Sequence, residues 1–556
     1  MESFQWKHPY QFDPAFSKRV AYFSMEFAIH QPLKTYAGGL GFLAGSHMRS
    51  AYALRQNMVG ISILWKYGYY DQIRKGDQTM NVLFQEKVYG FLQKTNIRFT
   101  IQVNHSQVQV TAYYLPPEVF GTAPIFFLST DLPENDYLAQ TISHMLYDAN
   151  MEAKIAAGIL LGVGGARLLE ILGYEPDIYH LNEAHALPLA FYLYHRFKKL
   201  EEVKKRLVFT THTPEEAGNQ KTDIFLLERM SYFYHLPLAE VKQLTGHSGD
   251  IFNHTQAALH VAKICNGVSD MHGEVSRQMW KFTKGICPII HITNAQNAAY
   301  WADKGLYEAL ENDDDEALVR RKKELKKILF EEVADQTGEI YDENICTIVW
   351  ARRFAGYKRA DLLLQDFDRF HAFITNQDMP VQLIWAGKPY PMDYPAISTF
   401  DRIVHITKKY SNCAILSGYE MKLSRMLKQG ADIWLNTPRL THEASGTSGM
   451  TAAMNGAINM STQDGWIPEF AKHLHNSFVL PAADTRLPVH EQDAIDNKNL
   501  MQRLEQEIVP MYYRQGKQWL EIQKNSMREI LPSFDSDRMA KEYYEKVYTY
   551  EASSVF

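Results

Sequence analysis

Short apolar runs that alternate with longer amphipathic stretches dominate the N-terminal half of the chain. The run VAYFSMEF (20–27) is typical of a strand, and it precedes the glycine-dense segment YAGGLGFLAGSH (36–47) and a helical stretch that ends near Ala53. Residues 152–173 have helical periodicity and end in glycine, and DIYHLNEAH and RLVFTTHTP each contain a strand followed by polar residues. Strands that alternate with helices predict a parallel sheet.

The segment RFTIQVNHSQVQVTAYYL (98–115) has a different period. Two runs of alternating apolar and polar residues flank Asn104 and His105, a pattern that predicts a β-hairpin. We interpret this hairpin as an antiparallel insertion in the first domain.

The pattern of hydrophobic and polar residues changes again in the C-terminal half. The segment ENDDDEALVRRKKELKKILFEEV (311–333) carries blocks of acidic and basic residues, which predict a solvated helix that links two domains. The strand-like segments CTIVWA, VQLIWAG, CAILSG and ADIWLNTP then alternate with helical stretches and predict a second doubly wound α/β domain. We therefore predict domains at 1–300 and 301–495, and a helical segment at 496–556 that packs across both.

Length and composition exclude several classes of protein. A chain of 556 residues is long enough for at least two large domains, and a net charge of -6 argues against a nucleic-acid-binding surface. The four cysteines are scattered without metal-ligand spacing, which is typical of reduced thiols in a cytosolic protein. The sequence has neither a signal-peptide core nor an apolar run of membrane-spanning length. We expect a cytoplasmic protein with no membrane and no nucleic-acid partner.

Four cations follow the strand CTIVWA directly. Arg352, Arg353, Lys358 and Arg359 lie within eight consecutive positions at a strand end, where ligands of open α/β sheets bind. Arginine offers a bidentate fork and lysine a point charge, so this segment predicts capture of a phosphate or a sugar diphosphate. A solvated turn is the alternative interpretation.

Three other segments are candidate binding loops. YAGGLG can bring backbone N–H groups close to an anion, although a structural turn explains it equally well. HLNEAH and TTHTP place histidines near strand ends, but their spacing matches no metal motif, so we predict no metal site. In EASGTSGM, Glu443 precedes small residues: its carboxylate suits sugar hydroxyls and the backbone donors suit a phosphate, with a plain helix start as the alternative.

Taken in order, eight segments resemble the α-glucan (glycogen and maltodextrin) phosphorylase family: VAYFSMEFAI, YAGGLGFLAGSH, HLNEAHALPLAFY, FTTHTPEEAG, GVSDMHGEVSRQMW, ARRFAGYKR, AGKPYP and NTPRLTHEASGTSGM. The resemblance runs from about Val20 to Asp464 and is closest to the short bacterial-type form, which implies that the N-terminal regulatory extension of animal phosphorylases is missing. It implies an α/β GT-B fold, with two Rossmann-like domains and an interdomain cleft. It also implies a retaining glucosyltransferase, a hexosyltransferase that moves glucosyl units to or from the non-reducing end of α-1,4-glucan.

The resemblance also implies the site residues and partners. The expected partners are α-1,4-glucan or maltooligosaccharide, and either phosphate and glucose 1-phosphate or a sugar nucleotide; a homodimer is the candidate oligomer. The implied catalytic residues are Arg353, Lys358 and His212. The implied substrate-binding residues are Glu443, Ala444, Ser445, Gly446, Tyr357 and Asn182. The implied pocket for a cofactor phosphate comprises Gly38, Gly39, Arg352, Thr447 and Ser448.

Thr451 departs from the family pattern. In the family, EASGT-x-x-M is followed by a lysine that forms a Schiff base with pyridoxal phosphate, whereas this chain has Thr451 after Met450. A hydroxyl group cannot form an imine, so we expect no covalently bound cofactor.

Three hypotheses remain open on the sequence. Pyridoxal phosphate could bind without a covalent link and support phosphorolysis. A sugar nucleotide could serve as donor without pyridoxal phosphate, with its second phosphate in the place of the cofactor phosphate. The chain could also be a catalytically inactive glucan-binding scaffold.

Overall fold

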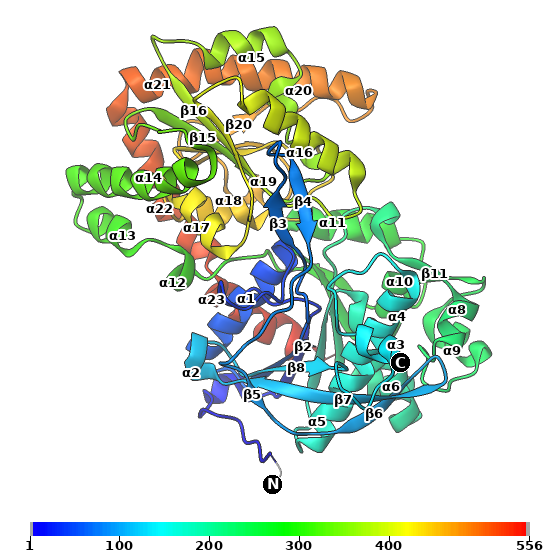
Figure 1. Cartoon of the computed structure of the whole chain (residues 1–556). Helices are drawn as coiled ribbons and strands as arrows, with labels where there is room; N and C mark the ends of the chain where they lie inside the picture. Colours follow the sequence, from blue (N-terminus) through cyan, green and yellow to red (C-terminus); the bar gives the residue numbers. More distant parts are fainter. Residues whose placement is uncertain (1–3, 552–556) are drawn as a thin grey trace. The chain divides into compact units, whose positions relative to one another are not determined.

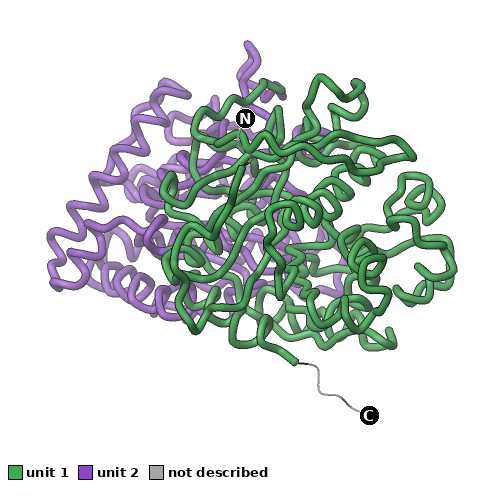
Figure 2. The backbone as a smooth tube through the Cα atoms, turned by 90° about the horizontal axis from the view of Figure 1, so that it is seen from below, with its two compact units in different colours: residues 1–69, 84–297, 536–556 green, residues 70–83, 298–535 purple. Residues whose placement is uncertain are grey.

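A computed structural model describes residues 4–551, which form two compact units (Figures 1 and 2). The first unit contains the residues up to Tyr69, Phe84–Asn297 and the chain from Ser536 on, and the second contains Tyr70–Leu83 and Ala298–Asp535. Compared with the predicted domains, the hairpin within 70–83 belongs to the second unit, and the C-terminal helical segment is divided between the units.

The first unit is built on one large sheet. Its order is β14 (Ile289–His291), β13 (Ile264–Gly267), β10 (Leu207–Thr210), β9 (Ile178–Asn182), β1 (Val20–Phe23), β2 (Met58–Ile63), β8 (Ile125–Ser129), β7 (Ser106–Leu115) and β5 (Gln93–Lys94). The strands from β14 to β8 are parallel, which confirms the predicted parallel sheet. Numbered along the chain, β8 to β13 have the order 3-2-1-4-5-6 of a doubly wound sheet.

The predicted antiparallel hairpin is present, and it extends the main sheet of the first unit. Strand β6 (Phe99–Val103) pairs antiparallel with β7 across Asn104 and His105, whose φ angles of 47° and 63° suit a two-residue turn. Strand β7 also pairs with β8 and therefore extends the main sheet. A second pair, β11 (Lys221–Asp223) and β12 (Ile251–Asn253), forms its own small ribbon.

Glycines let one long helix approach the loop after β9. The predicted helix at 152–173 is continuous, with a π-helical stretch at Leu160–Gly164 between α4 (Met151–Ile159) and α5 (Gly165–Ile171). A Cβ atom at Gly158 would lie 2.9 Å from the carbonyl oxygen of His185.

The other helices of this unit are α1 (Gly39–Ala53), α2 (Pro117–Phe120), α3 (Tyr137–Thr141), α6 (Pro188–Phe197), α7 (Leu200–Lys204), α8 (Ile224–Arg229), α9 (Leu238–Thr245), α10 (His254–Val261), α11 (Asp270–Trp280) and α23 (Ser536–Glu542).

The second unit has a sheet in which every strand is parallel to its neighbours. Its order is β17 (Cys413–Leu416), β16 (Val381–Ala386), β15 (Cys346–Ala351), β18 (Ile433–Asn436), β19 (Ile458–Thr462) and β20 (Phe478–Leu480). This order is again 3-2-1-4-5-6 and confirms the predicted doubly wound sheet. The hairpin of β3 (Asp71–Arg74) and β4 (Met80–Leu83) belongs to the same unit.

The helices of the second unit cover both faces of this sheet (Figure 1). They are α12 (Ala298–Trp301), α13 (Lys304–Glu311), α14 (Asp315–Thr337), α15 (Phe367–Ile374), α16 (Tyr394–Thr407), α17 (Met421–Gly430), α18 (Thr447–Ala453), α19 (Ile467–Phe470), α20 (Val489–Arg503), α21 (Val509–Arg514) and α22 (Gly516–Phe534).

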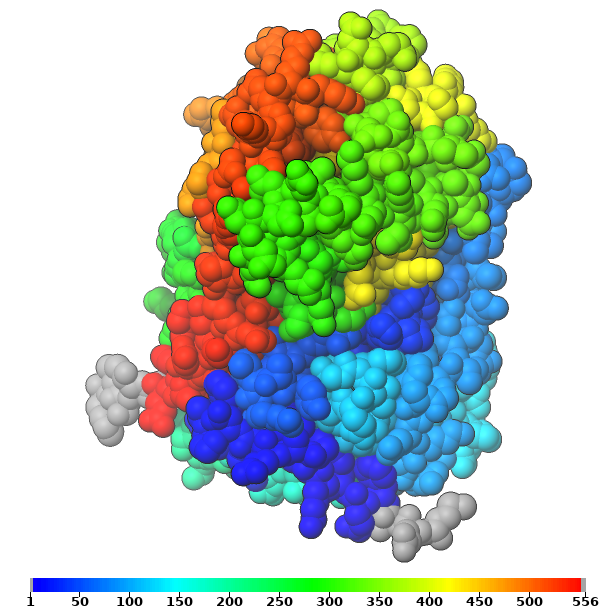
Figure 3. Space-filling model, turned by 90° about the vertical axis from the view of Figure 1, so that its left-hand side faces the viewer, coloured from blue at the N-terminus to red at the C-terminus, as the bar shows by residue number. Residues whose placement is uncertain are grey.

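The charged helix α14 is not the fully solvated linker that the sequence predicts. One face packs into the second unit, where Lys322 and Lys326 are buried. Lys322 Nζ donates to the carbonyl oxygens of Gln429 and Asn455 at 2.7 and 2.8 Å, and Lys326 Nζ pairs with Asp432 at 2.6 Å. The aliphatic stems of these lysines join the core while their ammonium groups find partners. The opposite face of α14 lies at the surface, in the green region of Figure 3.

Candidate active site

The strand order of the second sheet reverses between β15 and β18. These strands pair in parallel; the segment from Arg352 follows β15, and the loop that contains Glu443 follows β18. Doubly wound sheets bind ligands beyond the carboxyl ends of the strands at this reversal. The candidate anion residues and the candidate sugar residues of the second unit therefore come together at one point.

Glu443 is held between two of the candidate phosphate ligands. Its Oε2 atom accepts hydrogen bonds from Arg352 Nη2 and Lys358 Nζ, each at 2.8 Å. The Arg352, Lys358 and Glu443 side chains are only 4, 11 and 10% exposed. Burial acts to raise the pKa of Glu443, but the charges of Lys358 and Arg352 outweigh it and lower that pKa to about 2. Glu443 is therefore an ionised carboxylate that neutralises a cationic pocket.

Polar atoms beside this ion pair have unmet hydrogen-bonding capacity. Arg352 Nη1, Ser445 Oγ and Ser448 Oγ are buried and have no hydrogen-bond partner within residues 4–551. A buried polar group without a partner costs about 1–3 kcal/mol, so three of them in the segments that follow β15 and β18 point to a ligand. A guanidinium N–H and two hydroxyl groups are suitable donors for the oxygens of a phosphate.

The backbone around Glu443 depends on two glycines. Gly446 has φ 96° and precedes α18, and Gly465 has φ 62°. A Cβ atom at Gly465 would lie 2.2 Å from the carbonyl oxygen of Ser445, which accepts the backbone N–H of Trp466 at 3.0 Å. The loops after β18 and β19 are therefore in close backbone contact.

Arg359 has a structural partner instead of a place beside Glu443. Its Nη1 atom contacts Asp493 and Asp496 at 3.0 and 2.7 Å, and its Nε atom donates to the carbonyl oxygen of Thr437 at 2.8 Å. Of the four cationic residues that follow β15, Arg359 thus has a structural role: it links α20 to the loop after β18.

The remaining candidates of the second unit lie in the same two segments, after β15 and after β18. Arg353 is exposed, and its charge contributes to the low pKa of Glu443. The Tyr357 ring stacks on His442 with 6.1 Å between ring centroids. Ala444 is buried beside Glu443 in the chain, and Thr447 begins α18.

In the first unit, Asn182 and His212 meet at the ends of β9 and β10. His212 Nε2 and Asn182 Oδ1 are 2.7 Å apart, and because an amide oxygen only accepts, Nε2 carries the proton. Asn182 Nδ2 donates to Ser24 at 3.2 Å, so both ends of this amide are engaged and Asn182 orients His212. Burial, with smaller effects from two neighbouring histidines, lowers the pKa of His212 to about 3, so this imidazole is neutral at pH 7. Its backbone N–H donates to Glu183.

Gly38 lies beside a buried carboxylate. Glu26 Oε2 accepts the backbone N–H groups of Ala37 and Gly38 at 2.7 and 3.1 Å, and Glu26 Oε1 accepts the Tyr147 hydroxyl at 2.6 Å. The N–H of Gly38 is thus already engaged within the first unit, whereas the exposed Gly39 is the first residue of α1. Glu26 links the glycine loop to Tyr147.

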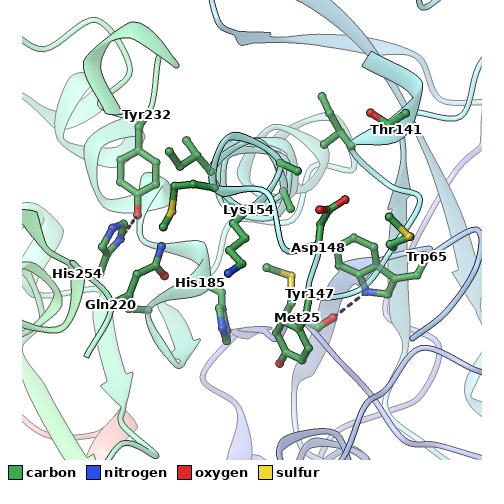
Figure 4. Close-up of a pocket in the computed structure, with 18 residues that line it drawn as sticks. Met25, Trp65, Thr141, Tyr147, Asp148, Lys154, His185, Gln220, Tyr232 and His254 are labelled. Carbon is green, nitrogen blue, oxygen red and sulfur yellow. Dashed lines mark hydrogen bonds between the residues drawn. The ribbon is translucent and has the colours of Figure 1, made fainter. Parts of the chain in front are cut away.

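A cavity of about 280 Å³ lies within the first unit beside His185 (Figure 4). His185 Nδ1 is buried without a hydrogen-bond partner in the described part of the chain, and burial lowers the pKa of His185 to about 4. Figure 4 shows Lys154 pointing from α4 toward His185. The lining combines aromatic and polar side chains, among them Trp65, Tyr147, Tyr232, Asp148, His185 and Gln220. This mixture suits a small ligand with both hydroxyl groups and apolar faces.

The sequence of the chain was compared with those of known proteins and protein families. A model of the carbohydrate phosphorylase family matches residues 292–482. Maltodextrin phosphorylase of Thermococcus litoralis is 32% identical over 96% of this chain and 71% of its own length. Glycogen phosphorylase of Aquifex aeolicus is 28% identical over 97% of this chain and 87% of its own length. An uncharacterized protein of Methanocaldococcus jannaschii is 48% identical over 96% of this chain and its full length.

The chain belongs to the carbohydrate phosphorylase family. The predicted family resemblance is thereby confirmed, and the second unit, with Arg352, Lys358 and Glu443, contains most of the segment that the family model matches.

Within this phosphorylase family member, Thr451 lies in α18 and is 1% exposed. Its Oγ1 donates to the carbonyl oxygen of Ser448 at 3.1 Å, and its carbonyl oxygen accepts from Asn455 Nδ2 at 2.8 Å. The unpartnered donors of Arg352 and Ser448 fit a phosphate group, but Thr451 supplies no amine for an aldehyde. The residues thus fit the phosphate end of pyridoxal phosphate and not its covalent attachment.

Sequence reasoning missed Asp464 in this phosphorylase family member. Asp464 is 2% exposed, and its Oδ2 atom accepts the backbone N–H groups of His442 and Glu443 at 3.0 and 2.9 Å. A DG pair after the strand INMST is ordinarily a turn signal, so the available clue was its place at a strand end next to β18.

Two structural observations concern other classes of function. Within residues 4–551, no helix combines the length and the apolar character that a membrane crossing needs. The same residues contain no group of three or more His, Cys, Asp or Glu side chains placed to hold a metal ion.

Proposed function

We propose that the protein is a retaining glucosyltransferase that moves glucosyl units to or from the non-reducing end of α-1,4-glucan. The observation that carries the proposal is the Glu443 carboxylate, held by Arg352 and Lys358 beside buried, unpartnered donors at the reversal point of a doubly wound sheet. Family membership supports it, because relatives over most of the chain are named maltodextrin phosphorylase and glycogen phosphorylase.

Each group has a role that its chemistry suits. Arg353 and Lys358 bind the phosphate of the reacting partner and stabilise charge that develops on the leaving oxygen, and Arg352 belongs to the pocket for the second phosphate. Glu443 accepts hydrogen bonds from glucosyl hydroxyl groups. In the first unit, the neutral His212 offers its unprotonated Nδ1 atom to a glucosyl hydroxyl group.

Each unit has its own part in this proposal. In the first unit, the aromatic and polar cavity beside His185 receives further sugar units of the glucan. In the second unit, Thr447 and Ser448 belong to the pocket for a second phosphate group.

Inorganic phosphate and glucose 1-phosphate are the proposed reaction partners, as the family names favour. Noncovalent pyridoxal phosphate, when bound, supplies a phosphate group that works as an acid/base or electrostatic partner of the substrate phosphate. Arg352, Thr447 and Ser448 would hold that group.

A sugar nucleotide is the second candidate donor, and Thr451 favours it. Without a lysine at this position the second phosphate pocket needs no cofactor, and the unpartnered donors of Arg352 and Ser448 suit the second phosphate of a nucleoside diphosphate equally well.

The test incubates the purified chain with maltopentaose and either inorganic phosphate, with and without pyridoxal phosphate, or UDP- or ADP-glucose. Release of glucose 1-phosphate supports phosphorolysis, and chain extension that needs a sugar nucleotide supports the second candidate. Lys358→Met is expected to abolish either activity, while Lys409→Ala, which changes an exposed lysine of the same unit, is expected to keep it. Glucan binding without turnover under any condition would contradict the enzymatic proposal and leave the scaffold.

A further inference from the structure

We propose that Asp464 is a positioning residue of this site: it holds the backbone that carries Glu443, and through Glu443 it sets the places of Arg352 and Lys358. The inference deepens the proposed function, on which it rests for the identity of the ligands. Its structural part stands on contacts within the second unit alone.

The carboxylate of Asp464 joins two neighbouring loops. It follows β19, and β19 pairs with β18, whose following loop contains Glu443. Oδ2 accepts the N–H groups of His442 and Glu443, and Oδ1 accepts the N–H of Gly465 at 2.9 Å. Three backbone donors from two loops thus converge on one side chain.

A second contact fixes the same loop from its other side. The Trp466 N–H donates to the Ser445 carbonyl oxygen at 3.0 Å, and a Cβ atom at Gly446 would lie 3.4 Å from the Trp466 ring. Asp464 thus holds the backbone on the N-terminal side of this loop, and Trp466 holds it on the C-terminal side. Together the two contacts fix the position from which Glu443 Oε2 accepts hydrogen bonds from Arg352 Nη2 and Lys358 Nζ at 2.8 Å.

The buried position of Asp464 disfavours its ionised form. Burial raises the pKa of Asp464 to about 6; the backbone hydrogen bonds oppose this effect and the Glu443 charge adds to it. Glu443 is the charged side chain that faces Asp464, and Arg352 and Lys358 direct their charges to Glu443. Buried carboxylates with a raised pKa and a charged neighbour cluster at functional sites.

Asp464→Asn is the informative variant because it preserves shape and removes one acceptor. The amide NH₂ group cannot accept, so Asp464→Asn cannot retain all three backbone bonds. In Asp464→Ala, which removes both acceptor oxygens, we expect the amides of His442 and Glu443 to exchange with solvent at least ten times faster. Asp378→Asn, at an exposed position of the same unit, is the matched control and is expected to leave this exchange unchanged.

The first measurement is hydrogen exchange of the intact chain at pH 7.5, followed by mass spectrometry of a peptide that covers residues 442–446. Faster exchange confined to this peptide, with an unchanged unfolding temperature, supports the positioning role. Unchanged protection in Asp464→Ala would overturn it, and so would faster exchange throughout the second unit, which would show a general role in folding.

The second measurement is the pH profile of glucan turnover. In the wild type we expect kcat to fall as the pH decreases through about 6, because protonation of Asp464 removes an acceptor for the backbone. In Asp464→Asn we expect kcat to be at least ten-fold lower and this acid limb to be absent, whereas a limb that came from phosphate ionisation would persist and contradict the role.

Failure of the proposed function can be separated from failure of this inference. If the wild type turns over no donor, calorimetric titration with inorganic phosphate replaces the activity assay. A several-fold change in phosphate affinity in Asp464→Asn, and none in Asp378→Asn, supports the positioning role without any turnover. An unchanged affinity in both variants would overturn it.

Discussion

Replacing Glu443 by Gln is expected to strengthen anion binding at the site. In the wild type, an incoming phosphate competes with the Glu443 carboxylate for Arg352 Nη2 and Lys358 Nζ, which it contacts at 2.8 Å. The neutral amide of the Glu443→Gln variant no longer compensates these two buried charges. The variant therefore leaves a cationic pocket whose best available counter-ion is the added anion.

The magnitude follows from the lowered pKa of Glu443. Its pKa falls from 4.5 to about 2, against the opposing effect of burial. At about 1.4 kcal/mol per pKa unit, the pocket favours the ionised carboxylate by roughly 3 kcal/mol. This stabilisation is present above pH 4.5 and is lost as the pH falls through about 2. Because phosphate recovers only part of this stabilisation, we expect a gain in phosphate affinity of about ten-fold, with about 300-fold as the upper bound.

Calorimetric titration with inorganic phosphate at pH 7.5 measures this gain. Lys358→Met, which removes a cation from the same pocket, is expected to weaken binding, and Lys409→Ala is expected to change nothing. Turnover of glucan by Glu443→Gln is expected to fall, since the carboxylate that accepts sugar hydroxyls is lost. Phosphate affinity that is equal or weaker in Glu443→Gln would refute the competition.

Three further predictions concern the cofactor position and the framework of the second unit. Thr451→Lys should gain an imine absorbance band on incubation with pyridoxal phosphate; no band would show that the pocket around α18 does not admit the cofactor. Gly465→Ala should lower the free energy of unfolding by about 1–3 kcal/mol, because φ is 62° and a Cβ atom would lie 2.2 Å from the carbonyl oxygen of Ser445. Urea denaturation measures this change, and an equally stable variant would contradict the contact. Burial lowers the pKa of Lys322 from 10.5 to about 7. Between these pH values the unfolded chain binds the proton and the folded chain does not, so the wild type should become more stable as the pH rises. Lys322→Met should lose this pH dependence, and an identical dependence in the variant would contradict the effect of burial.

Strands and helices of the second sheet were predictable because each carries its own local signal. The apolar run CTIVWA coincides with β15, and the amphipathic stretch MKLSRMLKQG coincides with α17. The hairpin of β3 and β4 shows the limit of such signals. Nothing in residues 70–83 predicts that they belong with a sheet whose first strand begins at Cys346, because that membership depends on long-range contacts such as Met80 N–H to Asp401 Oδ1 at 2.9 Å.

The sequence could indicate which residues belong to the candidate site, but not that they form an ion pair. Arg352, Lys358 and Glu443 stand out as charged residues at strand ends, but their ion pair joins positions 85 and 91 residues apart. Periodicity carries no information on such contacts. The same limit explains the charged helix α14, where the burial of Lys322 depends on the carbonyl oxygens of Gln429 and Asn455 at the ends of other elements.

Asp464 escaped prediction for a related reason. A single acidic residue before glycine is typical of a turn, and its role arises from the pairing of β18 with β19, which brings the His442 and Glu443 amides to its carboxylate. Thr451 illustrates the opposite situation. The prediction that no cofactor is bound covalently there follows from the sequence alone, because a hydroxyl group forms no imine in any surroundings.

Proton NMR of the newly formed anomeric centre tests the central claim most directly. The intact chain is incubated with maltopentaose and inorganic phosphate, with and without pyridoxal phosphate, or with a sugar nucleotide. The first product is then observed before it can equilibrate. The account predicts a glucosyl product with the α configuration, formed by the wild type and by Lys409→Ala and not by Lys358→Met. A β-configured product, or no glucosyl transfer to or from glucan under any of these conditions, would contradict it.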